Sequence, residues 1–262
     1  MTRRGGSGGL VRWPLVGAVL ALLVVPASVG TAGGDHGHPP RPPKPPTAVA
    51  DAGRPTVGAL FMDNGAGPHF CTATVIASRH RNLLLTAAHC MFENETGPPR
   101  AHVAFVPGYQ DGQRPYGTWP VREVVVSPQW RERADPDHDV AVLVVDEGIE
   151  DRTGAQRLLL DSRREQVVEV LGYPVREQRP VTCRNWTAEF SRTQRGFDCR
   201  GYLTGTSGGP WLTARGEVVG LVGGFQFGGD EVLHNYSPYL GDQARALYER
   251  AQQVRPGAGG GR

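Results

Sequence analysis

The central part of the chain alternates between short apolar runs, rich in β-branched residues, and polar segments rich in Gly, Pro, Asn and Asp. Apolar runs of this length, bounded by turn-forming residues, are typical of buried or half-buried strands. They predict strands at 72–76, 83–86, 102–106, 121–126, 140–145, 167–171 and 218–222. The spacing of the runs is irregular and no internal repeat is visible, so the pattern favours an antiparallel sandwich or barrel.

Apolar residues spaced for one helical face are clear only near the C-terminus. Between residues 238 and 253 they are Leu240, Ala244, Leu247, Tyr248 and Ala251. Ser237 directly precedes Pro238, as an N-cap residue precedes a proline in the first turn of a helix. We therefore expect one helix over residues 238–253, packed on a mostly β domain.

The first 32 residues have the organisation of a signal peptide. Arg3, Arg4 and Arg12 form a basic region, residues 15–25 are an apolar run, and small residues follow. Eleven helical residues rise only about 16 Å, roughly half of a bilayer core, so no stable membrane span is expected. The pattern predicts a secreted protein and leaves the export route and the cleavage point open.

Low-complexity segments lie on both sides of the strand-rich region. Residues 33–53 are a Pro-rich linker or pro-segment, because so many prolines favour extended conformations that bury no core. Residues 253–262 are Gly-rich and are expected to be a disordered tail. A single folded domain is therefore expected over residues 54–252.

The charge balance gives no support for nucleic-acid binding. The whole sequence has 28 basic and 26 acidic residues, and three of the basic ones lie in the predicted signal peptide, which has no acidic residue. The rest of the chain is thus almost neutral, whereas a nucleic-acid-binding domain usually carries a clear basic excess.

The four cysteines are Cys71, Cys90, Cys183 and Cys199. An even number in an exported protein predicts two disulfides, with three possible pairings. No two of them have the Cys-x-x-Cys spacing of a zinc site, and we expect no metal and no organic cofactor. Pairing each cysteine with its nearest neighbour would close two loops, each worth about 3 kcal/mol.

Three short motifs contain the residue types of nucleophilic catalysis. His89 follows Leu-Thr-Ala-Ala and precedes Cys90, Asp139 directly precedes an apolar strand, and Ser207 lies within Thr-Gly-Thr-Ser-Gly-Gly-Pro. Each motif alone has a structural explanation: a hydrogen-bonded core histidine, a polar residue at the start of a strand, or a tight turn. Asp135 and Asp137 are alternative candidates for the acid.

Taken in this order, the three motifs resemble the trypsin/chymotrypsin superfamily of serine proteases, and its secreted bacterial members in particular. The resemblance covers residues 54–252 and supports the Cys71–Cys90 pairing. It implies an all-β fold of two antiparallel Greek-key β-barrels with a C-terminal α-helix. The first barrel would span about 54–152 and the second about 153–252, with the active site between them.

The resemblance also implies a role for each site residue. His89 would be the general base, Asp139 would orient it, and Ser207 would attack the peptide carbonyl to form an acyl-enzyme. The backbone N–H groups of Gly205 and Ser207 would form the oxyanion hole. The expected protein is a monomeric endopeptidase that acts on polypeptides.

Two departures from the family pattern concern activation and specificity. Thr206 stands where many members have an aspartate that pairs with a newly formed N-terminus, so that activation switch is not expected. Gly201 stands where trypsin-type enzymes have the aspartate that binds basic side chains. The matching pocket wall contains Gly223, Gly224 and Phe225, which indicates an open or apolar pocket.

The acidic residues Asp230 and Glu231 are the remaining candidates for the pocket, although Gly-Gly-Asp-Glu at 228–231 predicts a hairpin turn. Where glutamate-specific relatives have a pocket histidine, this chain has Val222.

Two other functions fit parts of the sequence. Gly205-Thr-Ser-Gly-Gly209 also matches the nucleophile motif of α/β-hydrolases, but Pro210 and Trp211 follow it instead of the required helix. A secreted binding module that keeps the protease fold without catalysis is the main alternative, since motifs alone do not report geometry.

Overall fold

The computed structural model describes Gly9, residues 41–42, 44–94, 97–146, 148–230 and 232–254. The predicted signal peptide, apart from Gly9, lies outside the described residues, as do residues 33–40, Glu231 and residues 255–262. The chain divides into two compact units, Met1–Gly37 and His38–Arg262, and the described strands and helices all belong to the second.

Seven antiparallel strands form the first sheet, in the order β6-β5-β2-β3-β4-β8-β7. They are β2 (Val57–Phe61), β3 (His69–Ile76), β4 (Leu83–Thr86), β5 (Ala104–Pro107), β6 (Trp119–Pro120), β7 (Glu123–Val126) and β8 (Ala141–Val144). Two residues, Val121 and Arg122, link the edge strands β6 and β7. Val121 N–H donates to Val103 O, next to β5, and Arg122 N–H donates to Val144 O of β8, both at 2.8 Å. The link therefore brings opposite edges together, and the sheet curls into a barrel.

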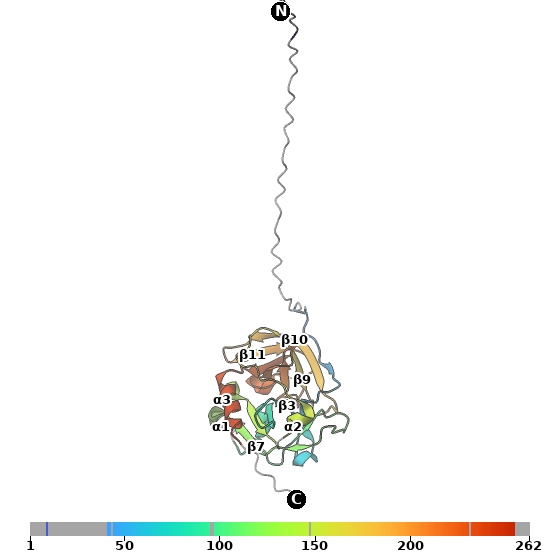
Figure 1. Ribbon diagram of the computed structural model, residues 1–262, viewed down its shortest axis with the longest axis vertical. Coiled ribbons are helices and arrows are strands. Elements are labelled where there is room, and N and C mark those ends of the chain that lie inside the picture. The colour runs from blue at the N-terminus through green and yellow to red at the C-terminus, as the bar shows by residue number, and fades with distance from the viewer. Residues whose placement is uncertain are drawn as a thin grey trace, which may run out of the picture. The chain divides into compact units, whose positions relative to one another are not determined.

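The second sheet has the strand order β13-β12-β9-β10-β11-β14, and β1 pairs with β10. Its strands are β1 (Val49–Ala50), β9 (Val167–Gly172), β10 (Val181–Glu189), β11 (Gln194–Asp198), β12 (Pro210–Leu212), β13 (Val218–Leu221) and β14 (His234–Pro238). The edge strands β13 and β14 approach each other, where Leu221 N–H donates to Ser237 Oγ at 2.9 Å. This sheet is therefore also curled (Figure 1).

Short helices connect and cover the two sheets. The α-helices are α1 (Pro128–Arg133), α2 (Ile149–Thr153) and α3 (Asp242–Ala251). The 3₁₀ turns are η1 (Asp63–Gly65), η2 (His89–Met91), η3 (Pro136–His138) and η4 (Phe225–Gly228). Helix α3 follows the second sheet in sequence but packs on β7 and β8 of the first (Figure 1). None of the described helices is long and apolar enough to cross a bilayer.

The C-terminal helix begins four residues later than the sequence pattern predicts. Ser237 and Pro238 belong to strand β14, and Gly241 occupies the N-cap position of α3. The Ser237 hydroxyl accepts from Leu221 N–H and donates to Pro238 O, so it serves the sheet and caps no helix. The tertiary hydrogen bonds of β14 therefore override the local helix signal.

Apolar side chains of both sheets form the core. The predicted strands match observed strands to within three residues at each end, because most of their side chains are buried. Strands β1, β2, β6, β10, β11, β12 and β14 were not among the predicted strands. Only two of the nine residues of β10 are buried, and β11 contains the buried Arg195. Polar residues at such positions hide a strand from a search for apolar runs.

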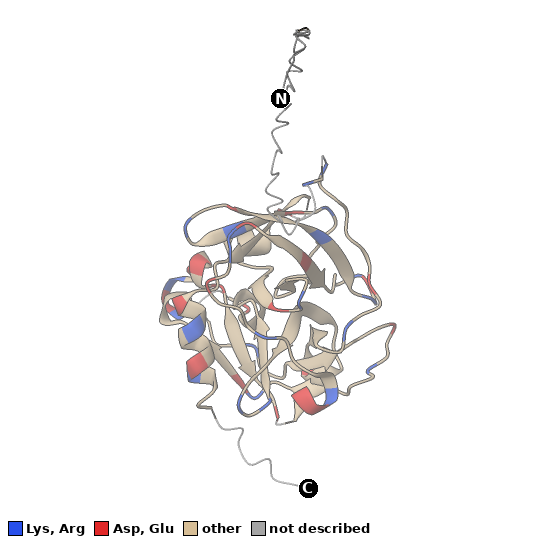
Figure 2. Cartoon of the chain, turned by 45° about the horizontal axis from the view of Figure 1, so that its top comes forward, with Lys and Arg blue, Asp and Glu red and all other residues tan. Residues whose placement is uncertain are grey.

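Part of the expected linker belongs to the second sheet. Ala48 N–H donates to Arg200 O at 2.8 Å, and Arg200 N–H donates to Pro46 O at 3.0 Å. Val49 and Ala50 pair with β10, and Asp51 N–H donates to Pro180 O. The folded unit therefore begins before residue 54. Acidic and basic residues are interspersed over its surface, as the balanced charge predicts (Figure 2).

Candidate active site

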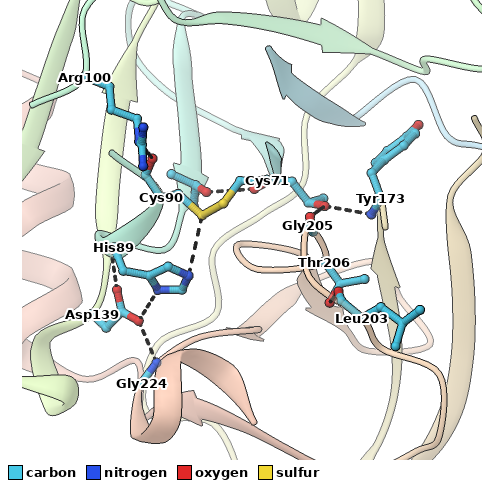
Figure 3. The surroundings of a disulfide bond; sticks show 12 residues. Cys71, His89, Cys90, Arg100, Asp139, Tyr173, Leu203, Gly205, Thr206 and Gly224 are labelled. Atoms are coloured by element: carbon cyan, nitrogen blue, oxygen red, sulfur yellow. Dashed lines mark hydrogen bonds and ion pairs between the residues drawn. A yellow bond between two sulfur atoms is a disulfide. The ribbon is translucent and has the colours of Figure 1, made fainter. Parts of the chain in front are cut away.

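His89 and Asp139 lie at the ends of two paired strands of the first sheet. Strands β4 and β8 are neighbours, and Thr86 lies opposite Ala141 in their register. His89 follows β4 by three residues and Asp139 precedes β8 by two. This pairing brings His89 Nδ1 to 2.7 Å from Asp139 Oδ2 (Figure 3). Among the described residues, Nε2 of the imidazole has no nitrogen or oxygen partner.

Three groups bind the carboxylate of Asp139, which is completely buried. Besides the imidazole, the backbone N–H of His89 donates to Oδ1 and the backbone N–H of Gly224 donates to Oδ2, both at 2.8 Å. Gly224 belongs to the second sheet's half of the molecule, so this bond links the acid to both halves. These three donors fix the position of the carboxylate, which in turn holds the imidazole ring in one orientation.

The other two candidate acids have different partners. Asp135 accepts from Asp137 N–H and from the Arg133 guanidinium. Asp137 Oδ1 accepts from the side-chain amide of Gln194 at 2.8 Å. Of the three aspartates, the structure brings Asp139 to the imidazole of His89.

The loop before Ser207 has a backbone that requires glycine. Gly205 has φ +101°, and a Cβ atom there would lie 2.5 Å from Tyr173 O and 2.7 Å from Val175 N. Within the described chain, the N–H groups of Gly205 and Ser207 donate to no protein acceptor. Two unpaired N–H groups on one tight loop can bind a negative oxygen of a ligand.

Thr206 lies between these two residues and closes the loop. Its N–H and its hydroxyl both donate to Leu203 O, at 3.1 Å and 2.9 Å (Figure 3). Thr206 is nearly buried and packs against Gly172. Many family members have an aspartate at the position of Thr206. Here the neutral threonine side chain makes a local hydrogen bond to Leu203 O instead.

Thr72 of strand β3 connects this loop to the first sheet. Its hydroxyl donates to Gly205 O at 2.9 Å and accepts from Tyr173 N–H at 2.8 Å, and its N–H donates to Ser207 O at 2.8 Å. The sequence does not single out this completely buried threonine, because nothing local distinguishes it from any other strand residue. Thr72 thus fixes the position of the serine loop relative to strand β3 and its neighbour β4, and β4 leads to His89.

His89 and Ser207 line the same cavity, of about 510 Å³. Among the described residues, no hydrogen bond joins Ser207 Oγ to the imidazole, whose Nε2 lies 3.9 Å from Cys90 Sγ. The aromatic ring of Phe227 packs edge-on against His89, with ring centroids 5.4 Å apart. In unliganded enzymes the hydrogen bond between nucleophile and base is often long and shortens when substrate binds.

The residues that line this cavity differ from those expected for the pocket. They are His89, Tyr202, Leu203, Thr204, Thr206, Ser207, Val222, Gln226, Phe227, Gly228, Gly229, Asp230 and Asn235. The four residues expected in the pocket are not among them: Gly201, Gly223, Gly224 and Phe225. Gly201, Gly223 and Phe225 are each next in sequence to a lining residue, namely Tyr202, Val222 and Gln226. Gly223 and Gly224 instead contact Asp139, where a Cβ on Gly223 would lie 3.1 Å from Oδ2.

The structure contains two disulfides, Cys71–Cys90 and Cys183–Cys199. The first lies directly behind His89 (Figure 3), and both of its sulfur atoms lie within 4.8 Å of a nitrogen of that histidine. This group has the elements of a metal site but not its chemistry. The two sulfurs are bonded to each other, so neither is a thiolate that could bind a metal ion.

Comparison with known proteins identifies the fold. The family model of the trypsin-like peptidase domain matches residues 71–221. The protease Anisep from Arthrobacter nicotinovorans superposes with a TM-score of 0.71 at 21% identity, covering 79% of this chain and all of that one. A thermostable serine protease, AL20, from an extremophilic microorganism gives 0.68 at 25% identity, covering 77% of this chain and 98% of that one.

A third solved structure, of a Glu endopeptidase, gives a TM-score of 0.67 at 18% identity, covering 80% of this chain and 98% of that one. No curated protein sequence matched the chain.

The two curled antiparallel sheets, the C-terminal helix and these structural neighbours define a chymotrypsin-like serine protease fold, and this confirms the prediction from the sequence. The family model matches more than half of the sequence. The chain belongs to the trypsin-like peptidase family.

Proposed function

We propose that this protein is a secreted serine endopeptidase that cleaves peptide bonds through His89, Asp139 and Ser207. The observation that carries the proposal is the shared cavity. It is lined both by His89, whose imidazole is bonded to the buried carboxylate of Asp139, and by Ser207, whose loop has two unpaired N–H groups among the described residues. These are the parts that acyl transfer requires: a base, a nucleophile and donors for the oxyanion.

In the proposed reaction, His89 Nε2 takes the proton of Ser207 Oγ as that oxygen attacks the substrate carbonyl. Asp139 holds Nδ1–H and stabilises the imidazolium that forms. The negative carbonyl oxygen receives hydrogen bonds from Gly205 N–H and Ser207 N–H. The imidazolium then protonates the leaving amine, and a water molecule activated by His89 hydrolyses the acyl-enzyme.

Secretion is part of the same proposal. It is supported by the N-terminal sequence pattern and by two disulfides, which form and persist in oxidising compartments. The protein is proposed to act as a monomer on polypeptide substrates.

The proposal is tested by covalent labelling with a small, uncharged fluorophosphonate, which reacts with an activated serine hydroxyl. We expect one adduct per chain by intact mass, and cleavage of an unfolded protein substrate that the label abolishes. Ser207→Ala should lose both activities. Ser191→Ala, which removes a hydroxyl bonded only within its own surface turn, should keep both.

A protein that neither labels nor cleaves would contradict the proposal and favour the non-catalytic binding module. Adduct formation that persists in Ser207→Ala would contradict the assignment of the nucleophile.

A further inference from the structure

The cavity beside Ser207 is lined by one acidic side chain among the described residues, the exposed Asp230. No arginine or lysine of the described chain lines this cavity. The charge of the lining is therefore negative when His89 is neutral. A negative cavity favours a cationic ligand and disfavours an anionic one.

Hydrogen bonds to one oxygen hold the carboxylate of Asp230 in a fixed orientation, and the other oxygen accepts none from the described residues. Its Oδ1 accepts hydrogen bonds from the N–H groups of Val232, Leu233 and His234, at 3.0 Å, 2.9 Å and 3.0 Å. These backbone donors, that of Leu233 first, lower the pKa of Asp230. Oδ2 accepts no hydrogen bond from any residue that the structure describes, so it remains available to a ligand.

Asn235 adds a second acceptor to the same cavity. It is only 4% exposed, and its Nδ2 is surrounded by the carbonyl oxygens of Phe197, Leu233 and Cys199, at 3.0–3.2 Å. Three carbonyls around one end of the amide fix that end as the donor. The other end, Oδ1, receives no hydrogen bond from a described donor.

The hydroxyl groups of two further lining residues, Tyr202 and Thr206, donate to carbonyl oxygens of the protein. Tyr202 donates to Val170 O, and Thr206 donates to Leu203 O. Asp230 Oδ2 and Asn235 Oδ1 are two acceptors of the lining that receive no hydrogen bond from a described donor. A carboxylate ligand would meet Asp230 without a compensating cation, which is unfavourable.

We propose that this cavity binds the cationic side chain of an arginine or lysine residue of the substrate, through Asp230 Oδ2 and Asn235 Oδ1. A guanidinium or ammonium group supplies the several N–H donors that two such acceptors require. The acid then comes from the loop after β13, and Gly201 needs no acidic side chain. The position of the scissile bond rests on the proposed function, but the cation site itself does not.

Binding to a catalytically inactive protein tests the cation site alone. In the Ser207→Ala protein we compare benzamidine, a planar cation, with benzamide, its neutral analogue, by calorimetry. We expect benzamidine to bind at least tenfold more tightly. Asp230→Asn should reduce this preference at least tenfold, since asparagine keeps an acceptor for the three N–H groups of the loop but loses the charge.

Asp242→Asn is the matched control, because it removes the same charge from an exposed position on α3. The preference for benzamidine should stay within twofold. Equal binding of benzamidine and benzamide, or a preference that survives Asp230→Asn, would overturn the cation site.

Kinetics on the active protein give the second measurement. The peptides differ only in the residue before the scissile bond. We expect kcat/KM to be higher for Arg and Lys than for Met, and higher for Met than for Glu. Asp230→Asn should lower the ratio of Arg to Met at least tenfold. A protein that labels at Ser207 but prefers Glu or Met would refute the cation site and leave the proposed protease function intact. Absence of labelling would refute only the proposed protease function.

Discussion

At the scale of single residues, the contacts of Asp139 are the most specific in the candidate site. One oxygen binds the backbone of His89, while the other binds both its imidazole and the N–H of Gly224. All three partners are donors, so the site requires an acceptor with two oxygens. An amide in its place would present N–H to a donor and would favour the wrong tautomer of the histidine.

We therefore predict that Asp139→Asn lowers kcat by three to four orders of magnitude, on the order seen when the triad acid is lost. Asp137→Asn should change kcat by less than about threefold, because Asp137 binds Gln194 and does not contact His89. The measurement is steady-state hydrolysis of one peptide by both variants. Equal losses would contradict the assignment of the acid.

The sequence was sufficient to select these residue types but not all of their partners. His89, Asp139 and Ser207 stand in recognisable motifs. The donation from Gly224 comes from a backbone group, which no residue type reveals. The same limit explains the pocket: matching positions to the family pointed to Gly201 and Phe225, whereas the cavity is lined by their neighbours Tyr202 and Gln226.

At the scale of elements, the joint between strand β3 and the serine loop holds the two halves of the site together. Thr72 supplies a hydroxyl and an N–H to the loop, and Thr86 Oγ1 donates to Thr72 O at 2.7 Å. Gly208 packs so closely here that a Cβ would lie 2.1 Å from Thr72 O. The loop that carries the nucleophile thus rests on the strand pair that leads to His89.

Thr72→Val should lower kcat at least tenfold with a smaller change in KM, because valine has the same shape but cannot bond Gly205 O or Tyr173 N–H. Thr72→Ser should restore most of the loss. Thr74→Val is the matched control on the same strand. It loses a buried hydroxyl bonded to Thr56 O within the first sheet, and should lower stability without changing kcat.

A loss of kcat in both valine variants, in proportion to their loss of stability, would show that Thr72 acts only through general stability. Thermal denaturation of each variant supplies that comparison.

Strands with continuous apolar runs could be predicted from the sequence, since burial on both faces leaves a local pattern. The start of α3 could not, because Ser237 and Pro238 have the local signature of a helix cap but pair with β11, and Ser237 also bonds β13. Likewise, the Pro-rich segment gave no hint that Ala48 pairs with Arg200, a contact between residues far apart in sequence.

At the scale of the whole molecule, each half of the fold has one disulfide. Cys71–Cys90 joins β3 to the turn that holds His89, and Cys183–Cys199 joins β10 to the residue after β11. The separations of 19 and 16 residues are similar, so the two bonds restrict the unfolded chain to a similar extent. The first includes Cys90, which is next in sequence to His89, whereas the second has no cysteine adjacent in sequence to His89, Asp139 or Ser207.

Replacing either pair of cysteines by alanine should lower the free energy of unfolding by about 3 kcal/mol. Loss of Cys71–Cys90 should also lower kcat well below the activity that remains without Cys183–Cys199, measured at a temperature where both variants are folded. Denaturant unfolding and hydrolysis rates, taken together, separate the two effects. Equal activity in the two variants would contradict a positioning role for the first disulfide.

The central claim is that His89, Asp139 and Ser207 act as one hydrogen-bonded unit with the N–H groups of Gly205 and Ser207. A crystal structure of the fluorophosphonate adduct tests it most directly. We predict phosphorus bonded to Ser207 Oγ, with the phosphonyl oxygen about 2.7–3.1 Å from both N–H groups and His89 Nε2 facing the adduct. Phosphorus on another residue, or a phosphonyl oxygen pointing away from Gly205, would contradict the account.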